Sequence, residues 1–215
     1  MRVGVLGTGM VGVALATRLV EVGHDVVMGS RTPDNEKAVA WAGSHPERAG
    51  AGTFSDAARH GEVVVNATSG SASLAALTAA GEENLEGKVL VDVANPIASY
   101  GPPIVLDPVA DDSLAEQVQR AVPAARVVKT LNTMNCDVMV RPATVPGDHD
   151  VFMAGDDPAA KDTVRSLLEE FGWPATSVRD VGDVTAARGL EMYLVLWIAL
   201  RMTLGHNAFN VRVVT

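Results

Sequence analysis

A glycine-rich turn near the start of the chain is the feature with the clearest chemistry. Gly7-Thr8-Gly9-Met10-Val11-Gly12 has the spacing GxGxxG and directly follows a short apolar segment. In such a turn Gly7 permits a sharp change of direction, Gly9 lets a pyrophosphate approach the backbone, and Gly12 lets the next helix pack closely. Free N–H groups at the start of that helix attract phosphates. The motif predicts a dinucleotide site at Gly7, Thr8, Gly9, Met10, Val11 and Gly12; the alternative is a plain structural βαβ unit.

Ser30 and Arg31 follow the next apolar segment and indicate which dinucleotide binds. Enzymes that use NAD usually carry Asp or Glu here, whose carboxylate binds the adenosine ribose. A hydroxyl and a guanidinium instead suit the 2′-phosphate of NADP, to which Ser30 can donate and which Arg31 can bind bidentately. Lys37 could add charge to the same phosphate. The alternative is that Arg31 and Lys37 only face solvent.

More polar residues stand where predicted buried strands end. Ala67, Thr68 and Ser69 follow one such strand, and Asn95 follows the next. Because the carboxyl ends of parallel strands face the ligand crevice, we predict that these four residues lie near the nicotinamide end of the cofactor. The alternatives are that Ser69 caps the following helix and that Asn95 is a turn residue before proline.

No Ser-His-Asp, Cys-His or metal-binding arrangement stands out, so no catalytic residue and no metal ligand is assigned. The five histidines lie apart in the sequence, and no ligand spacing typical of metals occurs. Hydride transfer is the reaction that a nicotinamide cofactor supplies. Lys129 is the one candidate proton donor at the predicted crevice; a structural or phosphate-pairing role is the alternative.

Alternating apolar segments predict the elements that must position these residues. Strands are expected at residues 3–6, 25–29, 53–54, 62–67, 88–93 and 126–129, with helices between them that include 33–43 and a short one capped by Ser55 or Asp56. This order is typical of an α/β fold with a Rossmann-type, doubly wound parallel sheet. Further strands are expected at 151–155, 175–178 and 209–213, and helices at 158–171 and 183–204. We expect an NADP-binding domain over residues 1–145 and a small C-terminal α/β or helical domain over 146–215.

Composition excludes several kinds of partner. The formal charge of −9 over 215 residues and the lack of a basic run argue against nucleic acid. The single Cys136 cannot form an internal disulfide, and the first strand leaves no room for a signal peptide, so a cytoplasmic location is expected. The longest apolar run, residues 192–200, is too short for a bilayer. The apolar helix at 183–204 predicts burial against a partner subunit, hence a homodimer.

Five segments together carry a family resemblance. They are Gly7–Gly12, Gly29-Ser30-Arg31, Asp92–Asn95, Val127–Thr133 and Ala187–Glu191. Through them the chain resembles the NADPH-dependent reductases of coenzyme F420, the 8-hydroxy-5-deazaflavin:NADP oxidoreductases. It is also similar to the oxidoreductase domain of the STEAP metalloreductases.

The resemblance implies a cofactor, a co-substrate and a reaction. NADP is expected on the first domain, in contact with Thr8, Met10, Ser30, Arg31 and Thr68. From the same resemblance we expect the small C-terminal domain to close over NADP and a deazaflavin to lie in the cleft between the two. Hydride then passes between nicotinamide carbon 4 and deazaflavin carbon 5. The loop Asn132-Thr133-Met134 is expected to line this acceptor cleft.

Three functions follow as hypotheses. The leading one is an NADPH-dependent oxidoreductase whose small-molecule acceptor is coenzyme F420 or a related flavin-like ring. The second is a reductase of a small carbonyl or imine, although such enzymes usually have a longer, all-helical second domain than the 70 residues at 146–215 here. The third is a non-catalytic NADP sensor, since no acid or base is assigned.

Overall fold

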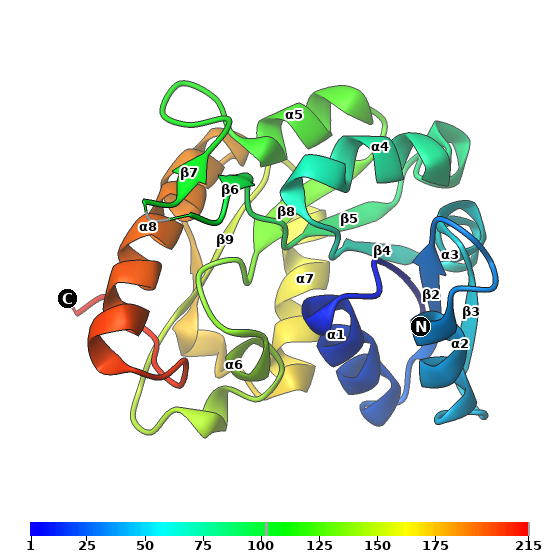
Figure 1. The fold of residues 1–215 in the computed structure, drawn as a ribbon, viewed down its shortest axis with the longest axis horizontal. Coiled ribbons are helices and arrows are strands. Elements are labelled where there is room, and N and C mark those ends of the chain that lie inside the picture. The colour runs from blue at the N-terminus through cyan, green and yellow to red at the C-terminus, as the bar shows by residue number, and fades with distance from the viewer. Residues whose placement is uncertain (102, 215) are drawn as a thin grey trace.

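One eight-stranded sheet forms the centre of the computed structural model, which describes residues 1–101 and 103–214 (Figure 1). Six strands are mutually parallel in the order β3-β2-β1-β4-β5-β8. Their bounds are β1 Arg2–Leu6, β2 Asp25–Ser30, β3 Ala49–Thr53, β4 Val63–Asn66, β5 Val89–Asp92 and β8 Arg126–Thr130. This is the Rossmann strand order, and the predicted fold class is confirmed.

Side chains that alternate along the strands build a separate core on each face of the sheet. On one face Val5, Val65 and Val91 pack against α1 Met10–Glu21, α2 Glu36–Gly43 and α7 Pro158–Phe171. On the other face Val64 and Leu90 pack against α3 Phe54–His60, α4 Gly70–Ala80 and α5 Leu114–Ala121. Because both faces are covered, the strands are nearly continuous apolar runs rather than alternating ones.

Two further strands extend the same sheet. β9 (Val151–Ala154) pairs antiparallel with β8, and β10 (Val178–Asp180) pairs parallel with β9. The other regular elements are the small β6–β7 pair at Ile97–Ser99 and Val105–Leu106, α6 Cys136–Val140, the 3-10 turns Glu82–Asn84, Pro142–Thr144, Ala175–Ser177 and Val184–Ala186, and α8 Ala187–Leu204. A division at residue 145 stays a prediction, because residues 146–215 add strands to the first sheet and form no second one within the described part.

Helix α8 packs one face against the protein and exposes another. Leu190, Glu191 and Leu194 are buried. The exposed apolar side chains of this helix are Met192, Val195, Leu196, Met202 and Leu204. Within the described residues, α8 and the other helices are all too short or too polar to cross a membrane.

Several predicted boundaries were wrong. Residues 49–53, expected as mostly loop, form edge strand β3; its small residues Ala49-Gly50-Ala51-Gly52 have low strand propensity, and pairing with β2 decides their conformation. Phe54 opens a helix, and Thr53 caps it in a capping box with Asp56. Helix α2 begins after Asn35, whose side chain accepts from the N–H of Ala38.

The C-terminal half also differs from prediction. The strand expected at 175–178 lies at Val178–Asp180, because Pro174 is followed by a 3-10 turn. Residues 209–213 are not a strand. Asp150, just before β9, joins this segment through three hydrogen bonds. Its N–H donates to the carbonyl of Val211, its carbonyl accepts from the Asn210 side chain, and its carboxylate accepts from the N–H of Val213.

Candidate cofactor and hydride-acceptor cleft

The three motif glycines have the geometry that a phosphate-binding turn requires. Gly7 has a φ of +117°, a conformation that side chains rarely adopt. A Cβ on Gly12 would lie 2.2 Å from the carbonyl oxygen of Gly7, so α1 packs directly on the turn. A Cβ on Gly9 would meet no protein atom within 4 Å. The backbone at Gly9 is therefore open to a ligand.

Two helix N-termini face the same open space. Helix α1 begins after Gly9 and α4 begins after Ser69, and neither cap residue makes a side-chain capping bond. Their first N–H groups therefore lack a side-chain acceptor at the cap, and the positive ends of both helix dipoles point into this region. Anionic groups of a ligand are stabilised at such a position.

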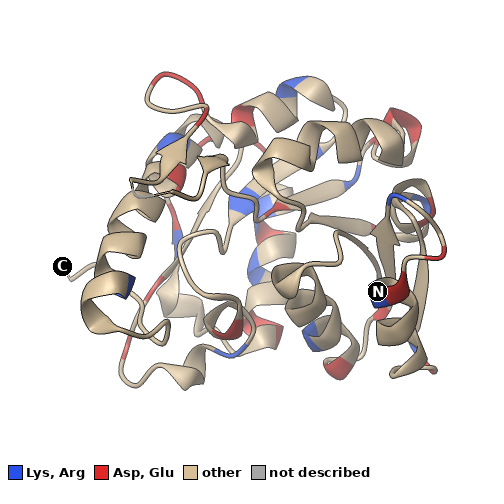
Figure 2. Cartoon of the chain, in the orientation of Figure 1, with Lys and Arg blue, Asp and Glu red and all other residues tan. Residues whose placement is uncertain are grey.

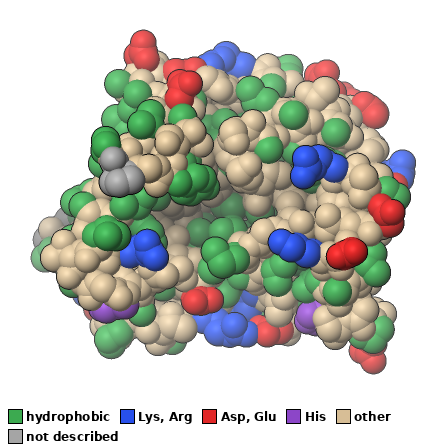
Figure 3. Space-filling view, viewed as in Figure 1, with side chains coloured by type: hydrophobic (Ala, Val, Ile, Leu, Met, Phe, Trp, Pro, Cys, Tyr) green, Lys and Arg blue, Asp and Glu red, His purple; other side chains and the backbone are tan. Residues whose placement is uncertain are grey.

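A cleft of about 410 Å³ lies between these helices and α8. Figure 3 shows it as a hollow at the centre of this face, bordered largely by hydrophobic side chains. Its walls are formed by Gly9, Met10, Val11, Ala67, Thr68, Ser69, Gly70, Val93, Ala94, Asn95, Ile97, Tyr100, Met134, Asn135, Cys136, Met139 and Trp197. Segments from the N-terminal, middle and C-terminal parts of the chain thus meet in one cavity.

The described walls contain no Asp, Glu, Lys, Arg or His. The turn after β1, the turn after β4 and helix α4 are likewise free of charged residues (Figure 2). Burial, followed by the neighbouring Asp137, raises the pKa of the Cys136 thiol, so this side chain stays neutral. Tyr100 is 79% exposed and lies at the rim. The described walls therefore present dipoles of the backbone and of neutral polar side chains, and no formal charge.

Ser30, Arg31 and Lys37 lie outside this cavity, beyond the end of β2. The N–H of Gly7 donates to the carbonyl of Gly29 at 2.9 Å, which places the β2 end beside the glycine turn. Arg31 and Lys37 are exposed and form no ion pair with any described residue. Ser30 is buried, and its hydroxyl donates to the carbonyl of Thr32 at 2.5 Å, so its proton is already engaged. Arg31 and Lys37 are the groups free to meet a phosphate.

The polar residues after β4 are tied to one another. The Thr68 hydroxyl donates to the Asn66 side chain at 2.7 Å and lies 3.0 Å from the Ser73 hydroxyl. Thr68 is half-buried and lines the cleft, and Ala67 and the exposed Ser69 do so as well. Thr8 is also half-buried, but it lies in the turn rather than on the described walls.

Asn95 and the loop after β8 form another wall of the cleft. Asn95 and Met134 line the cleft, whereas Asn132 and Thr133 are each only 2% exposed and lie behind it. The Asn132 amide donates to the Asn95 side chain at 3.0 Å and to the carbonyl of Leu190 on α8 at 2.9 Å. Asn132 therefore supports this wall from within, and Met134 faces the open space.

Comparison with known proteins agrees with this geometry. The family described as NADP oxidoreductase coenzyme F420-dependent matches residues 2–96. The F420-dependent NADP reductase of Methanothermobacter marburgensis is 31% identical over 214 residues, which cover 94% of this chain and 93% of that protein. The chain belongs to this family. It is an NADP-dependent oxidoreductase.

Two other proteins are similar to this oxidoreductase. An Arthrobacter sp. FB24 protein of known crystal structure is 48% identical with a TM-score of 0.93, and the match covers 99% of both chains. Metalloreductase STEAP3 of Rattus norvegicus is 32% identical over 192 residues. That match covers 88% of this chain but only 36% of STEAP3, so the chain spans about a third of that relative.

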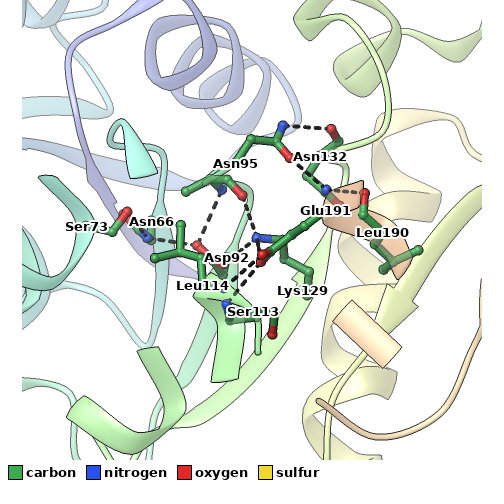
Figure 4. A network of polar contacts seen from close by, with 12 residues as sticks. Asn66, Ser73, Asp92, Asn95, Ser113, Leu114, Lys129, Asn132, Leu190 and Glu191 are labelled. Carbon is green, nitrogen blue, oxygen red and sulfur yellow. Dashed lines mark hydrogen bonds and ion pairs between the residues drawn. The ribbon is translucent and has the colours of Figure 1, made fainter. Parts of the chain in front are cut away.

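Lys129 of this NADP-dependent oxidoreductase does not reach the cleft. Its side chain is 0% exposed, and its ammonium donates to Asp92 Oδ2 at 2.8 Å, to the Ala94 carbonyl at 2.5 Å and to Glu191 Oε1 at 2.8 Å (Figure 4). All three N–H donors are thereby used. Burial by itself lowers the pKa of Lys129, but the two carboxylates outweigh it and raise the pKa above its ordinary value. Of the roles left open for Lys129, the structure favours the structural one, because its ammonium is enclosed by three acceptors and does not line the cleft.

The sequence reasoning missed several residues of this oxidoreductase. Cys136, Met139 and Tyr100 line the cleft. Nothing in the sequence distinguishes these three residues from ordinary apolar or loop residues, so they could not be predicted. Glu191 and Asp92 are buried in ion pairs with Lys129. A usable signal did exist for these two, because a carboxylate within a long apolar helix or at the end of an apolar strand needs a buried partner. No group of three or more potential metal ligands occurs among the described residues.

Proposed function

We propose that this oxidoreductase transfers hydride between NADP(H) and a deazaflavin such as coenzyme F420, or another flavin-like ring. One observation carries the proposal: the described cleft walls contain no carboxylate, imidazole, ammonium or guanidinium group. Reduction of a carbonyl or imine requires a proton donor near the reacting atom. A flavin-like ring instead delocalises the arriving electron pair and takes its proton from water. The name of the Methanothermobacter marburgensis relative also supports an F420 acceptor.

We propose that NADP follows the path from the β2 end to the cleft. The open backbone at Gly9 and the start of α1 fit a pyrophosphate, and Arg31 with Lys37 fits a 2′-phosphate. The proposed cofactor residues are Gly7, Thr8, Gly9, Met10, Val11, Gly12, Arg31, Lys37, Ala67, Thr68, Ser69 and Asn95. Ser30 supports the Arg31 turn through its bond to Thr32 rather than by donating to the phosphate.

The residues around the cleft then orient the two rings. When bound, the nicotinamide supplies the hydride. Met10, Met134, Met139 and Trp197 offer apolar surface at the cleft, which favours flat, conjugated rings. The protein's contribution is to hold donor and acceptor carbons about 3–3.5 Å apart. No side chain has to move a proton in this scheme.

A spectrophotometric assay tests the proposal. The purified protein is mixed with NADPH and oxidised F420, and the absorbance of both is followed under anaerobic conditions. We expect stoichiometric loss of both chromophores, with riboflavin or FMN as the comparison acceptor. Turnover of cyclic imines or small ketones without turnover of F420 or flavins would favour the carbonyl or imine reductase. Saturable NADPH binding without any turnover would favour the NADP sensor.

We also propose that the protein is a homodimer. The apolar stripe of α8, formed by Met192, Val195, Leu196 and Met202, remains exposed in a single chain. These residues recur at the spacing of one helix face, and a second copy of the same face would cover them. The predicted cytoplasmic location rests on the single cysteine and stays a prediction.

A further inference from the structure

The two walls of the cleft come from segments far apart in the chain. Ala94 and Asn95 follow β5, whereas Trp197 belongs to α8, and all three line the same cavity. The separation of these walls sets how closely two rings can approach across the cleft. A displacement of about 1 Å between reacting atoms can cost about a hundredfold in rate. Whatever joins the walls therefore matters for hydride transfer.

A row of polar side chains lies directly beneath the first wall. Asn66, Asp92 and Lys129 are register partners at the ends of three neighbouring strands. Asn66 donates to Asp92 Oδ1 at 2.8 Å, and Lys129 donates to Asp92 Oδ2. All three side chains are fully buried, at 0% exposure. The next residues of these strands lead into the loops that line the cleft.

Lys129 connects this row of polar side chains to both walls of the cleft (Figure 4). Its bond to the Ala94 carbonyl holds the backbone of the first wall. Its ion pair with Glu191 holds α8, the helix that carries Trp197 six residues further on. That separation corresponds to about 9 Å along a helix. One ammonium group thus binds a strand end, the backbone of one wall and the helix of the other.

Glu191 also joins α8 to helix α5. Its oxygens accept from the N–H groups of Leu114 and Ala115 at 2.8 and 3.0 Å, at the start of α5. Because Asn132 also donates to the carbonyl of Leu190, α8 is held at two successive residues. Any shift of α8 along its axis would break buried charge-assisted bonds.

We propose that Lys129 and Glu191 are positioning residues for hydride transfer: together they set the separation between the Ala94–Asn95 wall and the α8 wall of the cleft. Neither residue touches the cleft, so each acts through the backbone that it holds. The inference rests on the proposed use of this cleft for hydride transfer, but it does not depend on which ring is the acceptor. It also gives a reason for an ion-pair cluster that is buried but not at the cavity surface.

Glu191→Gln is the main test variant, because it removes one charge and keeps the size of the side chain and the Lys129–Asp92 pair. Lys129→Arg is the second variant, which keeps the charge but changes the donor geometry. We expect both to lower the single-turnover rate of hydride transfer about tenfold to a hundredfold, with the Kd for NADPH changed less than about twofold. The deuterium isotope effect with 4-deuterated NADPH should rise as the chemical step becomes slower.

Glu116→Gln is the matched control. The buried Glu116 forms an ion pair with the partly exposed Arg188 that also joins α5 to α8. Glu116 lies on no described wall of the cleft and forms no bond to Ala94. We expect it to lose stability as Glu191→Gln does while the hydride-transfer rate of the folded protein stays unchanged. Equal rates for Glu191→Gln and Glu116→Gln, after correction for the folded fraction, would overturn the inference.

A second measurement, the fluorescence of bound NADPH, tests the positioning role even if the proposed acceptor is wrong. If the wild-type protein turns over neither F420 nor flavins, the proposed acceptor is wrong, but the fluorescence of bound NADPH still reports the surroundings of the nicotinamide. We then expect Glu191→Gln to change that emission at saturating NADPH, whereas Glu116→Gln leaves it as in the wild type. Identical emission from all three proteins would overturn the positioning role.

Discussion

Asn95 and Asn132 bind each other twice. Asn132 Nδ2 donates to Asn95 Oδ1 at 3.0 Å, and Asn95 Nδ2 donates back to the carbonyl of Asn132 at 2.9 Å. The backbone of Leu131, just before Asn132, has a φ of +63°, which is rare for leucine. These bonds hold the loop after β8 in its conformation and join it to the loop after β5.

Asn132→Ala should loosen this junction. The change removes the two bonds that the Asn132 side chain donates, to Asn95 Oδ1 and to the carbonyl of Leu190, at a cost of about 1–3 kcal/mol in the free energy of unfolding. The bond from Asn95 Nδ2 to the backbone carbonyl of residue 132 is not removed. We expect urea denaturation to show that loss and acceptor turnover to fall, while NADPH binding changes little. Asn84→Ala is a suitable comparison, because Asn84 bonds to Ser55 and Ala80 away from the cleft. Unchanged stability and turnover in Asn132→Ala would contradict a supporting role.

Arg31→Asp should change the preference between cofactors. Removal of a charge-assisted contact costs about 1.5–3 kcal/mol, or roughly tenfold to 150-fold in Kd, and the new carboxylate also repels the 2′-phosphate. Isothermal titration calorimetry should show much weaker NADPH binding and nearly unchanged NADH binding. Arg120→Asp makes the same charge change at an exposed site on α5 and serves as the control. An equal loss for both cofactors would exclude Arg31 as the 2′-phosphate ligand.

Gly9→Val should separate ligand binding from folding. The new side chain enters open space, so the melting temperature should change little, but it occupies the approach of the pyrophosphate and should abolish binding of both NADPH and NADH. Gly12→Val should instead prevent stable folding, because its Cβ would lie 2.2 Å from the carbonyl oxygen of Gly7. Wild-type affinity in Gly9→Val would mean that the phosphates bind elsewhere.

Acid should weaken the contact between α5 and α8. The hydrogen bonds from Arg188 hold the pKa of Glu116 below its ordinary value of 4.5. The folded state therefore binds fewer protons at this site than the unfolded state does. The stabilisation is fully present above about pH 4.5 and is lost as the pH falls through the lower, folded-state pKa. The difference in unfolding free energy between wild type and Glu116→Gln should be constant above pH 4.5 and shrink below it; a difference independent of pH would refute this.

Leu196→Glu should produce a monomer if the α8 stripe joins two copies. Leu196 is 54% exposed in the single chain, so we expect the change to disturb little packing within it. Sedimentation velocity should show a dimer for the wild type and a monomer for the variant, with unchanged circular dichroism. Val39→Glu, on the exposed side of α2, is the control. A wild-type monomer would disprove the proposed dimer.

The features that the sequence predicted correctly depend on single residues and their immediate neighbours. The positive φ of Gly7, the close packing at Gly12 and the open backbone at Gly9 are properties of single residues and their neighbours, so the motif indicated them correctly. The apolar strands and the order of elements likewise predicted the Rossmann sheet. Strand β3 was misplaced, because its alanines and glycines carry no strand signal apart from their pairing with β2.

Tertiary structure alone decided which polar groups meet. Lys129 stood at a strand end with a plausible proton-donor role, but its actual role follows from Asp92 on the neighbouring strand and Glu191 on a distant helix. In the same way, Asn132 supports the wall that Met134 faces. The sequence determined the turn that suits a dinucleotide because backbone conformation depends on adjacent residues. Which buried charges share one enclosed space depends on strand order and helix packing, and these are properties of the folded chain as a whole.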